Sequence, residues 1–325
     1  MSVPDTRNSP DSTLLKVENL VVRFPISGGQ YIRPVDEVGF YIDKGEVLSL
    51  VGESGSGKST IGKALLRMVE PAAGTIWMNG QDVTHIGGSR VVQYRKNVQM
   101  VFQDPFGSLN PVRTVEQHLA FPLRKHRMDR SMSVNQRIDE LLEKVGLTPV
   151  AETRRKFPHE LSGGQRQRVA IARALSVNPK FVVADEPISM LDVSIRAGIL
   201  RLMNELRADL SLGFLYITHD LASARYIGNR IMVLYGGRVM ETAASDEVLR
   251  HPLHPYTRLL LAATPGSGHQ GELPEVANAA PNLVEGRIGC PFAPRCPLAT
   301  DECREATPPL TEHSSGHFVS CYHPG

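Results

Sequence analysis

Cysteine is scarce in this chain, and net charge is nearly absent. The 325 residues include four cysteines, all after position 289, which is too few for a scaffold held together by disulfide bonds. Lys and Arg number 36 and Asp and Glu number 34, which gives a net charge of +2. Such a balance gives no support for a protein whose main work is to coat nucleic acid or an anionic membrane.

Long apolar runs are also missing, and we expect no signal peptide at the start of the sequence. The apolar runs at 47–51 and 231–235 have the length of a strand, whereas a membrane helix needs about 20 apolar residues. Residues 1–10 lack the charged-then-apolar layout of a signal peptide. We therefore expect the chain to stay in the cytosol unless a partner holds it to a membrane.

Short apolar strands alternate with helical patterns over residues 14–263. This alternation predicts an α/β fold built on a mainly parallel sheet, with two antiparallel strands near the start and a hairpin at 231–241. Asp192 is the expected N-cap of the third helix, and Pro71 is expected to end the first. The predicted strands are 15–24, 37–42, 47–51, 98–102, 181–184 and 215–218, and the predicted helices are 59–70, 165–177 and 193–210.

The composition changes after Thr264. Residues 265–271 are typical of a linker, and the rest of the chain is rich in Pro and His and holds every Cys. This segment is too short and polar to build a good core unaided. We expect a disordered tail over 1–13, a main domain over 14–264 with a helical subdomain at about 104–178, and a Cys-rich C-terminal extension over 265–325.

Residues 52–60, GESGSGKST, fit the phosphate-binding pattern G-x-x-x-x-G-K-[ST] between an expected strand and an expected helix. Glycines let backbone N–H groups turn onto phosphate oxygens, and the helix N-terminus adds a partial positive charge. Lys58 can reach the β and γ phosphates, and Ser59 can offer its hydroxyl to Mg²⁺. The predicted nucleotide ligands here are Gly52, Glu53, Ser54, Gly55, Ser56, Gly57, Lys58, Ser59 and Thr60.

An apolar strand ends in Asp185 and Glu186. A carboxylate at that edge of the sheet can hold Mg²⁺ through water, and Glu186 is placed to polarise the attacking water. Together with the phosphate loop, this pair predicts a P-loop nucleotidase, a class that includes kinases and GTPases.

The sequence LSGGQ at 161–165, followed by a helical run, narrows the class. Here the chain resembles the ATP-binding subunits of ABC transporters, whose signature this is. The resemblance implies the fold of an ABC ATPase domain, with an antiparallel β subdomain and a helical subdomain. It also implies that the signature binds the γ-phosphate of ATP held on the opposite subunit, through Ser162, Gly163, Gly164 and Gln165.

Other positions take their expected roles from the same resemblance. Gln103 matches the residue that senses Mg²⁺ and touches the membrane subunits, and His219 matches the histidine that contacts the γ-phosphate. Asp192 matches the loop that crosses between the two ATP subunits. Phe24 matches the aromatic that stacks on adenine, with Tyr31 as the alternative. Mg²⁺ is then expected on Ser59, Gln103 and Asp185, and the expected catalytic residues are Glu186, His219, Lys58 and Gln103.

Four longer segments resemble the oligopeptide/dipeptide importer ATPases. They are FQDPFGSLNP at 102–111, RRKFPHELSGGQ at 154–165, HPLHPYTR at 251–258 and GCPFAPRCP at 289–297. The resemblance implies a motor subunit on the cytoplasmic face of the membrane, powered by ATP and Mg²⁺. Its implied partners are a second ATPase subunit, identical or different, two permease subunits and an outside binding protein, with no nucleic acid. Related systems import nickel or glutathione, so the cargo stays open.

Two alternatives come from other classes. A soluble ABC ATPase acting on DNA or ribosomes usually has long coiled-coil insertions or two cassettes, and neither feature occurs here. A non-enzymatic regulator with a sensing Cys segment is disfavoured because Lys58, Asp185, Glu186 and His219 are all intact.

Cys290, Cys296, Cys303 and Cys321 gather in one short polar segment, which favours a metal site over coincidence. Four thiolates suit either Zn²⁺ or an iron–sulfur cluster, and His313, His317 and His323 could complete a mixed zinc site. The spacing does not choose between them. The family resemblance implies a [4Fe–4S] cluster on the four cysteines, and we expect it to fold the extension without a part in ATP hydrolysis.

Overall fold

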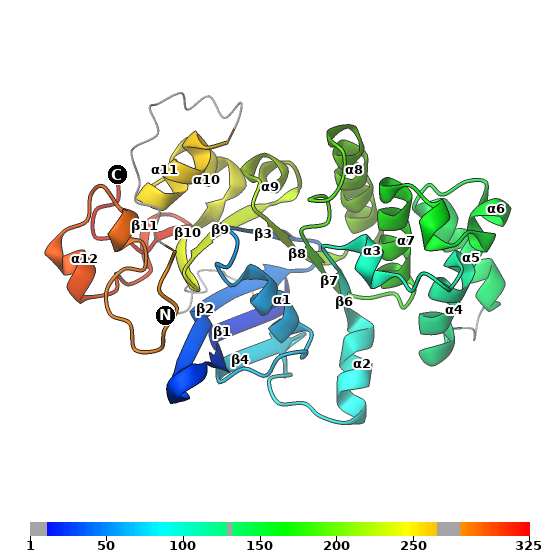
Figure 1. Cartoon of the computed structure of the whole chain (residues 1–325), viewed down its shortest axis with the longest axis horizontal. Coiled ribbons are helices and arrows are strands. Elements are labelled where there is room, and N and C mark those ends of the chain that lie inside the picture. Colours follow the sequence, from blue (N-terminus) through cyan, green and yellow to red (C-terminus); the bar gives the residue numbers. More distant parts are fainter. Residues whose placement is uncertain (1–11, 129–131, 265–279) are drawn as a thin grey trace. The chain divides into compact units, whose positions relative to one another are not determined.

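The computed structural model describes residues 12–128, 132–264 and 280–325 and divides the chain into two compact units (Figure 1). Unit 1 combines Met1–Ile86 with Leu215–Gly325, and unit 2 is Gly87–Phe214. Most of the expected tail, and the expected linker at 265–271, lie outside the described residues. Across the described ranges, no helix is both long and apolar enough to cross a membrane.

Unit 1 contains an antiparallel sheet of four strands in the order β2-β1-β4-β5. The first strand already begins at Thr13, which pairs with Asp43, so this residue, expected to be the last of the tail, belongs to the sheet. Asn79 and Gly80 both have positive φ and make the tight turn between the last two strands. The strands are β1 (Thr13–Pro25), β2 (Tyr31–Asp43), β4 (Ala73–Met78) and β5 (Gln81–Asp82), with the 3-10 turn η2 (Ser27–Gly29) between the first two.

The second sheet of unit 1 carries the phosphate loop. Its strand order is β11-β12-β10-β9-β3-β8, with β3 parallel to β9 and an antiparallel β9–β10 hairpin turned by Gly236 and Gly237. The predicted strands at 47–51 and 215–218 and the predicted hairpin are confirmed. The bounds are β3 (Val47–Val51), β8 (Gly213–Thr218), β9 (Arg230–Tyr235), β10 (Arg238–Ala244), β11 (Thr311–Ser314) and β12 (His317–Val319).

The first helix is shorter than predicted. It was expected over 59–70 with Pro71 as its stop, but α1 spans Lys58–Leu65. Arg67 takes a left-handed φ of 56°, and the N–H groups of Arg67 and Met68 donate to the carbonyls of Ala64 and Lys63. This is the Schellman ending, which usually uses glycine at the left-handed position. Because Arg stands there, the sequence carried no sign of the helix end.

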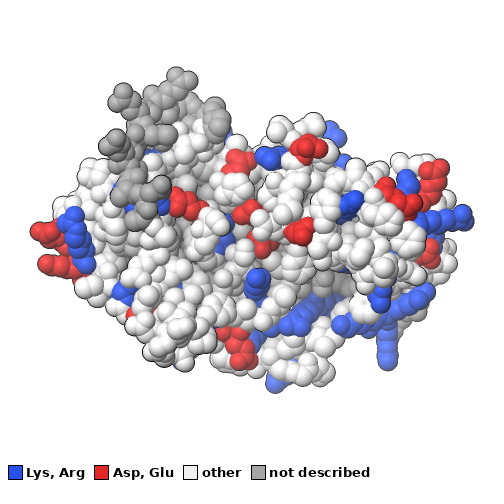
Figure 2. Space-filling view, viewed as in Figure 1, with Lys and Arg blue, Asp and Glu red and all other residues white. Residues whose placement is uncertain are grey.

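The remaining helices of unit 1 flank this sheet or belong to the C-terminal segment. They are α9 (Leu221–Ile227), α10 (Ser245–Arg250), α11 (Pro255–Ala262), η4 (Ala293–Arg295) and α12 (Asp301–Glu305). Over α12, at the left of the view, acidic and basic side chains lie side by side (Figure 2), and Arg304 pairs there with Asp301 at 3.0 Å.

Unit 2 holds two parallel strands and a group of helices. In β6 (Val98–Val101) and β7 (Phe181–Asp185), Val101 pairs with Ala184, so both strands end at the same edge. Figure 1 shows α4 to α7 gathered together in green. The helices are α2 (Ser89–Asn97), α3 (Pro105–Ser108), α4 (Val115–Lys125), α5 (Val134–Lys144), α6 (Val150–Arg155), η3 (Pro158–Glu160), α7 (Gly163–Leu175) and α8 (Val193–Leu210).

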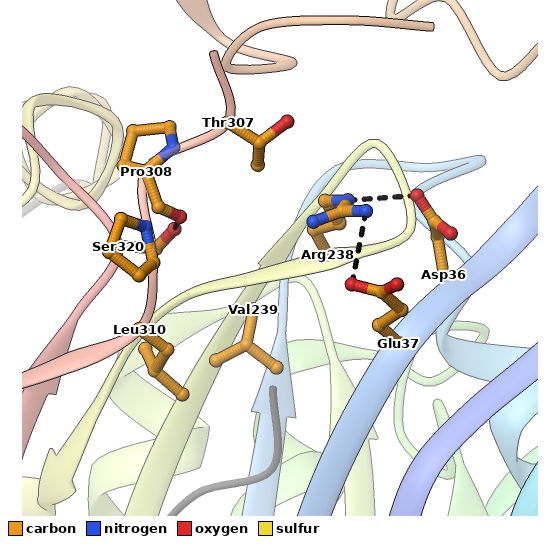
Figure 3. A pocket seen from close by; sticks show the side chains of 9 residues that line it. Asp36, Glu37, Arg238, Val239, Thr307, Pro308, Leu310 and Ser320 are labelled. Atoms are coloured by element: carbon orange, nitrogen blue, oxygen red, sulfur yellow. Dashed lines mark hydrogen bonds and ion pairs between the residues drawn. The ribbon is translucent and has the colours of Figure 1, made fainter. Parts of the chain in front are cut away.

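The C-terminal segment is joined to unit 1 by strand pairing and by buried polar contacts. β12 pairs with β10, and the buried His317 contacts the buried Glu241 through its Nε2 at 2.7 Å. Arg287 donates to the Asp36 carboxylate at 3.1 Å. Beside it, Arg238 bonds both Asp36 and Glu37 in the wall of a pocket whose far side is formed by Thr307, Pro308, Leu310 and Ser320 (Figure 3). The segment is thus part of the fold of unit 1.

Candidate nucleotide-binding and hydrolysis site

The phosphate loop of unit 1 leaves no space for a Cβ atom at Gly52 or at Gly57. A Cβ on Gly52 would lie 2.2 Å from the carbonyl oxygen of Leu234, and a Cβ on Gly57 would lie 1.9 Å from that of Pro34. Gly57 is also the N-cap of α1 and has a left-handed φ of 105°. The motif glycines are therefore required by close approach to β9 and β2 as well as by the turn.

The side chain of Lys58 is hydrogen-bonded to this loop. Its side chain is buried, and Nζ donates to the carbonyl oxygens of Gly52 and Glu53 at 2.7 and 2.8 Å and to Ser56 Oγ at 3.3 Å. The ammonium thus sits at the N-terminus of α1, where the helix also favours negative charge. Ser54 and Gly55 are exposed at the tip, while Ser59 and Thr60 are half-buried in the first turn of α1. This cradle fits the phosphates of a nucleotide.

The two aromatic candidates for adenine stacking lie at the same end of the β1–β2 pair. Phe24 pairs with Ile32, and its side chain is 37% exposed. Tyr31 pairs with Pro25, and the guanidinium of Arg23 lies 4.6 Å from its ring centroid. One face of Tyr31 is therefore occupied, which favours Phe24 as the stacking surface.

His219 leaves β8, the strand next to β3 in the sheet, so the histidine and the phosphate loop follow neighbouring strands. His219 is exposed. The turn that presents it is held by Asp220, whose N–H donates to Thr218 Oγ1 at 3.0 Å and whose carboxylate accepts from the N–H groups of Ala222 and Ser223.

In unit 2, the carboxyl ends of β6 and β7 bring Gln103 and Glu186 together. Gln103 Nε2 donates to Glu186 Oε2 at 3.0 Å. Glu186 has a left-handed φ of 43°, and its carbonyl oxygen accepts from the N–H and hydroxyl of Ser189 at 3.2 and 3.0 Å. Asp185, one residue earlier, is buried at the end of the strand. Because of this turn, the carboxylates of Asp185 and Glu186 have different surroundings: Asp185 is buried, and Glu186 is bonded to Gln103.

The signature sequence caps α7. Ser162 Oγ accepts from the N–H of Gln165 at 3.3 Å, and Gln165 Oε1 accepts from the N–H of Ser162 at 3.0 Å. The N–H groups of Gly163 and Gly164, at the first helical positions, have no carbonyl partner within a helix and suit an anion. A Cβ on Gly164 would come within 2.7 Å of Ile195 on α8, so glycine also allows close packing there.

Asp192 stands at the N-cap position of α8, as predicted, but its side chain makes no capping hydrogen bond. The expectation that its carboxylate caps the helix is therefore wrong. Its exposed side chain instead stands at the surface of unit 2.

Comparison with known proteins decides the family. Residues 35–189 match the family described as ABC transporter, and residues 240–303 match the one described as oligopeptide/dipeptide transporter, C-terminal region. An oligopeptide transport ATP-binding protein of Bacillus subtilis, AppF, is 42% identical over 95% of this chain and 97% of its own length. The chain belongs to the oligopeptide/dipeptide family of ABC transporter ATP-binding proteins.

Other relatives agree with this assignment. A putative peptide import ATP-binding protein of Brucella ovis is 42% identical to this ABC ATPase over 96% of the chain and 98% of its own length. Among solved structures, the ATP-binding cassette MJ0796, described as a dimer in a post-hydrolysis state bound to ADP and Pi, matches with a TM-score of 0.64 and 30% identity. That match covers 71% of this chain and 99% of the cassette. The predicted ABC ATPase fold is confirmed.

The predicted site residues of this ABC ATPase fall into two sets. Phe24, the phosphate loop and His219 belong to unit 1, and the others, Gln103, Asp185, Glu186, Ser162, Gly163, Gly164, Gln165 and Asp192, belong to unit 2. The predicted Mg²⁺ ligands are divided in the same way, with Ser59 in unit 1 and Gln103 and Asp185 in unit 2.

The four cysteines of the ABC ATPase line one small cavity, together with His254 and His323. All four are free thiols, and burial raises the pKa of Cys290 to about 11 and also raises that of Cys296 and Cys321. Nevertheless, among the described residues there is no group of three or more His, Cys, Asp or Glu placed to hold a metal ion. The donor chemistry suits a metal, whereas the spacing of the side chains does not.

The sequence did not indicate how Glu53 is used. Its N–H donates to Tyr256 Oη at 3.0 Å, and its carboxylate accepts from Arg295. Glu53 was predicted only as a member of the phosphate loop, and these polar groups serve contacts within the protein instead. No local pattern could have paired it with an arginine 242 positions later in the chain.

Proposed function

We propose that this ABC ATPase is the ATP-hydrolysing motor subunit of an importer for di- or oligopeptides, bound peripherally at the cytoplasmic face of the membrane. The observation that carries the proposal is the contact of Gln103 Nε2 with Glu186 Oε2 at 3.0 Å, in a chain that also has an intact phosphate loop. The names of its relatives, which refer to peptide transport and peptide import, support the cargo class.

In this proposal, Lys58 and the loop N–H groups hold the β and γ phosphates of ATP, and His219 contacts the γ-phosphate. Ser59, Gln103 and Asp185 would hold Mg²⁺, which when bound neutralises charge on the phosphates. Glu186 accepts the proton of the attacking water as a general base. The hydrogen bond from Gln103 orients that carboxylate, so a single residue can serve both the metal and the base.

Two ATPase subunits would sandwich two ATP molecules head to tail, each site combining one phosphate loop with the partner's signature. The dimeric cassette among the solved relatives supports this arrangement. Ser162 and the N–H groups of Gly163 and Gly164 would then cover the γ-phosphate, with Asp192 near the crossing between subunits. The second subunit can be an identical or a different chain.

Permease subunits are the proposed partners at the segment 103–110. Phe106 there is 50% exposed and has the guanidinium of Arg166 at 4.1 Å from its ring centroid. Arg166 lies on the signature helix α7, so this contact links the proposed permease surface to the signature within unit 2. An extracytoplasmic binding protein would deliver the cargo.

Uptake measurements test the function. Cells lacking this chain should lose import of labelled di- and oligopeptides and regain it with the wild-type chain but not with Glu186→Gln. Loss of nickel or glutathione uptake with normal peptide uptake would assign one of those cargoes. Normal uptake of all three would favour a soluble ABC ATPase outside transport.

We also propose that Cys290, Cys296, Cys303 and Cys321 hold a [4Fe–4S] cluster, with Zn²⁺ as the alternative. The support is that all four thiols line one cavity. Binding would have to deprotonate these thiols and draw them together. Protein purified without oxygen should be brown and contain iron and sulfide. Colourless protein with stoichiometric zinc would replace the cluster by zinc, and metal-free protein would leave the thiols as packing residues.

A further inference from the structure

Arg295, in the C-terminal segment, bonds a residue of the phosphate loop. Arg295 donates from its two terminal nitrogens to the two carboxylate oxygens of Glu53, at 2.7 and 3.0 Å. The Arg295 side chain is 14% exposed. Two parallel, charge-assisted hydrogen bonds of this kind fix direction as well as distance, unlike an ordinary surface ion pair.

Arg295 is itself held by the cysteine-bearing part of the segment. It ends the short helix η4, which lies between Cys290 and Cys296 in the chain. The N–H of Cys290 donates to the carbonyl of Cys303 at 2.7 Å, and the N–H of Ala293 donates to the carbonyl of Cys290 at 3.0 Å. A change in the conformation of the cysteine loops would therefore move the guanidinium.

An aromatic cluster fixes the same helix in the core. Phe292 is fully buried, and its ring centroid lies 5.3 Å from those of Tyr235 and Tyr256. Arg295 also donates to Tyr235 Oη at 3.3 Å, and its guanidinium lies 5.6 Å from the Tyr235 ring centroid. The arginine is therefore set rigidly toward the loop.

On the loop side, every polar group of Glu53 has a partner within unit 1. The N–H donates to Tyr256, the carbonyl oxygen accepts from Lys58 at 2.8 Å, and the carboxylate accepts from Arg295. Because Lys58 bonds the same residue that Arg295 clamps, a shift of Glu53 would displace the ammonium that is expected to bind phosphate.

We propose that Arg295 is a positioning residue for nucleotide binding, which couples the cysteine-bearing segment to the phosphate loop through the carboxylate of Glu53. The proposal rests on ATP binding at this loop. It goes beyond the expectation that a metal cluster folds the extension without a part in ATP hydrolysis, because it gives the segment a part in ATP binding. By linkage, bound nucleotide must in turn stabilise the segment.

The paired hydrogen bonds from Arg295 to the Glu53 carboxylate are called the clamp below. Steady-state ATP hydrolysis and binding of a fluorescent ATP analogue test whether the clamp supports ATP binding. Arg295→Met removes the guanidinium and keeps much of the apolar stem, and should raise both the KM and the Kd for ATP by about tenfold, with a smaller change in kcat. Arg295→Lys should restore part of the affinity, because an ammonium can bond one carboxylate oxygen. The matched control is Arg304→Met, which removes an arginine of the same segment whose partner, Asp301, lies on the surface of α12. It should bind ATP as the wild type does.

A double variant separates positioning from general weakening of the fold. If Arg295 acts through Glu53, then Glu53→Gln should raise KM to a similar extent, and the combination with Arg295→Met should add little. Additive losses would overturn the proposal. If Arg295→Met does not fold, Glu53→Gln decides alone, and an unchanged KM refutes the clamp.

Amide hydrogen exchange tests the coupling in the other direction. A non-hydrolysable ATP analogue should slow exchange over residues 290–296 in the wild-type chain, and this slowing should disappear in Arg295→Met or Glu53→Gln. Equal slowing in all chains would reject the coupling. A wild-type chain that binds no ATP would instead reject the proposed function, whereas wild-type affinity in Arg295→Met would reject the clamp alone.

Discussion

Replacement of Gly57 by Ala tests whether the phosphate loop depends on close backbone approach. The left-handed φ of 105° would cost an L-residue about 1–2 kcal/mol by itself. In addition, the new Cβ would meet the Pro34 carbonyl oxygen at 1.9 Å, and ordinary contact begins at 3.4 Å. Since the obstacle is backbone, either β2 or the loop must move by more than an ångström.

A displacement of this size at the start of α1 would move Lys58 and the first-turn N–H groups away from the phosphates. Because a misplacement of about 1 Å can cost roughly a hundredfold in rate, we expect kcat/KM for ATP hydrolysis to fall by about 10²-fold or more. Thermal unfolding should also show lower stability than the wild type.

The matched control is Gly45→Ala, in the turn between β2 and β3. Gly45 also has a positive φ, 73°, but its added Cβ would meet no atom within 4 Å. This variant should lose about 1–2 kcal/mol of stability from backbone strain and keep the wild-type KM for ATP. Gly57→Ala with near-wild-type kcat/KM, or Gly45→Ala with an equal loss of kcat/KM, would show that close backbone approach at Gly57 does not control hydrolysis.

Three further predictions concern the catalytic base, the composite sites and a buried histidine. Glu186→Gln should lower steady-state hydrolysis by about 10²–10⁴-fold while ATP binding persists, because only the general base is lost. Normal turnover would show that Glu186 is not the general base. Lys58→Ala should lose phosphate binding itself, and Ser162→Arg should block the partner's site. A mixed dimer of these two variants should have one site that combines the altered phosphate loop with the altered signature, and one site in which both are wild type. Turnover at half the wild-type level would show this. Equal loss or equal survival of activity at both sites would exclude the head-to-tail arrangement. Burial lowers the pKa of His254 to about 4, below its usual 6.5, so as pH falls the unfolded chain takes up a proton before the folded chain does. The contribution of this histidine to the free energy of unfolding is therefore highest above pH 6.5 and decreases as the pH falls toward 4. Between pH 7 and 5 this loss should be about 2 kcal/mol in urea unfolding. His254→Asn, whose amide oxygen can still accept from the Tyr256 N–H as Nδ1 does, should remove that part of the pH dependence; an unchanged slope would show that other groups cause it.

The features that depend on short stretches of chain could be predicted from the amino-acid sequence alone. The phosphate loop, the apolar strand before it, the strand that ends at Asp185 and the β9–β10 hairpin all follow from residue types at fixed spacing. The strands before the loop and at Asp185 were predicted within one residue of their bounds, whereas β10 runs three residues beyond the predicted end of the hairpin at 241. Family membership followed from the signature and the longer segments beside it, and the comparisons confirm it. These features are local because hydrogen bonding and burial over five to fifteen residues dictate them.

Contacts between distant parts of the chain could not be predicted from the sequence and became visible in the folded structure. Gln103 and Glu186 are 83 positions apart and meet because β6 and β7 are parallel neighbours, and Glu53 and Arg295 meet across 242 positions. Even the end of α1 escaped prediction, because Arg67 holds a left-handed position that usually requires glycine. The physical reason is the same in each case: a side chain's type limits what it can bond, whereas packing of the whole unit selects which partner it bonds.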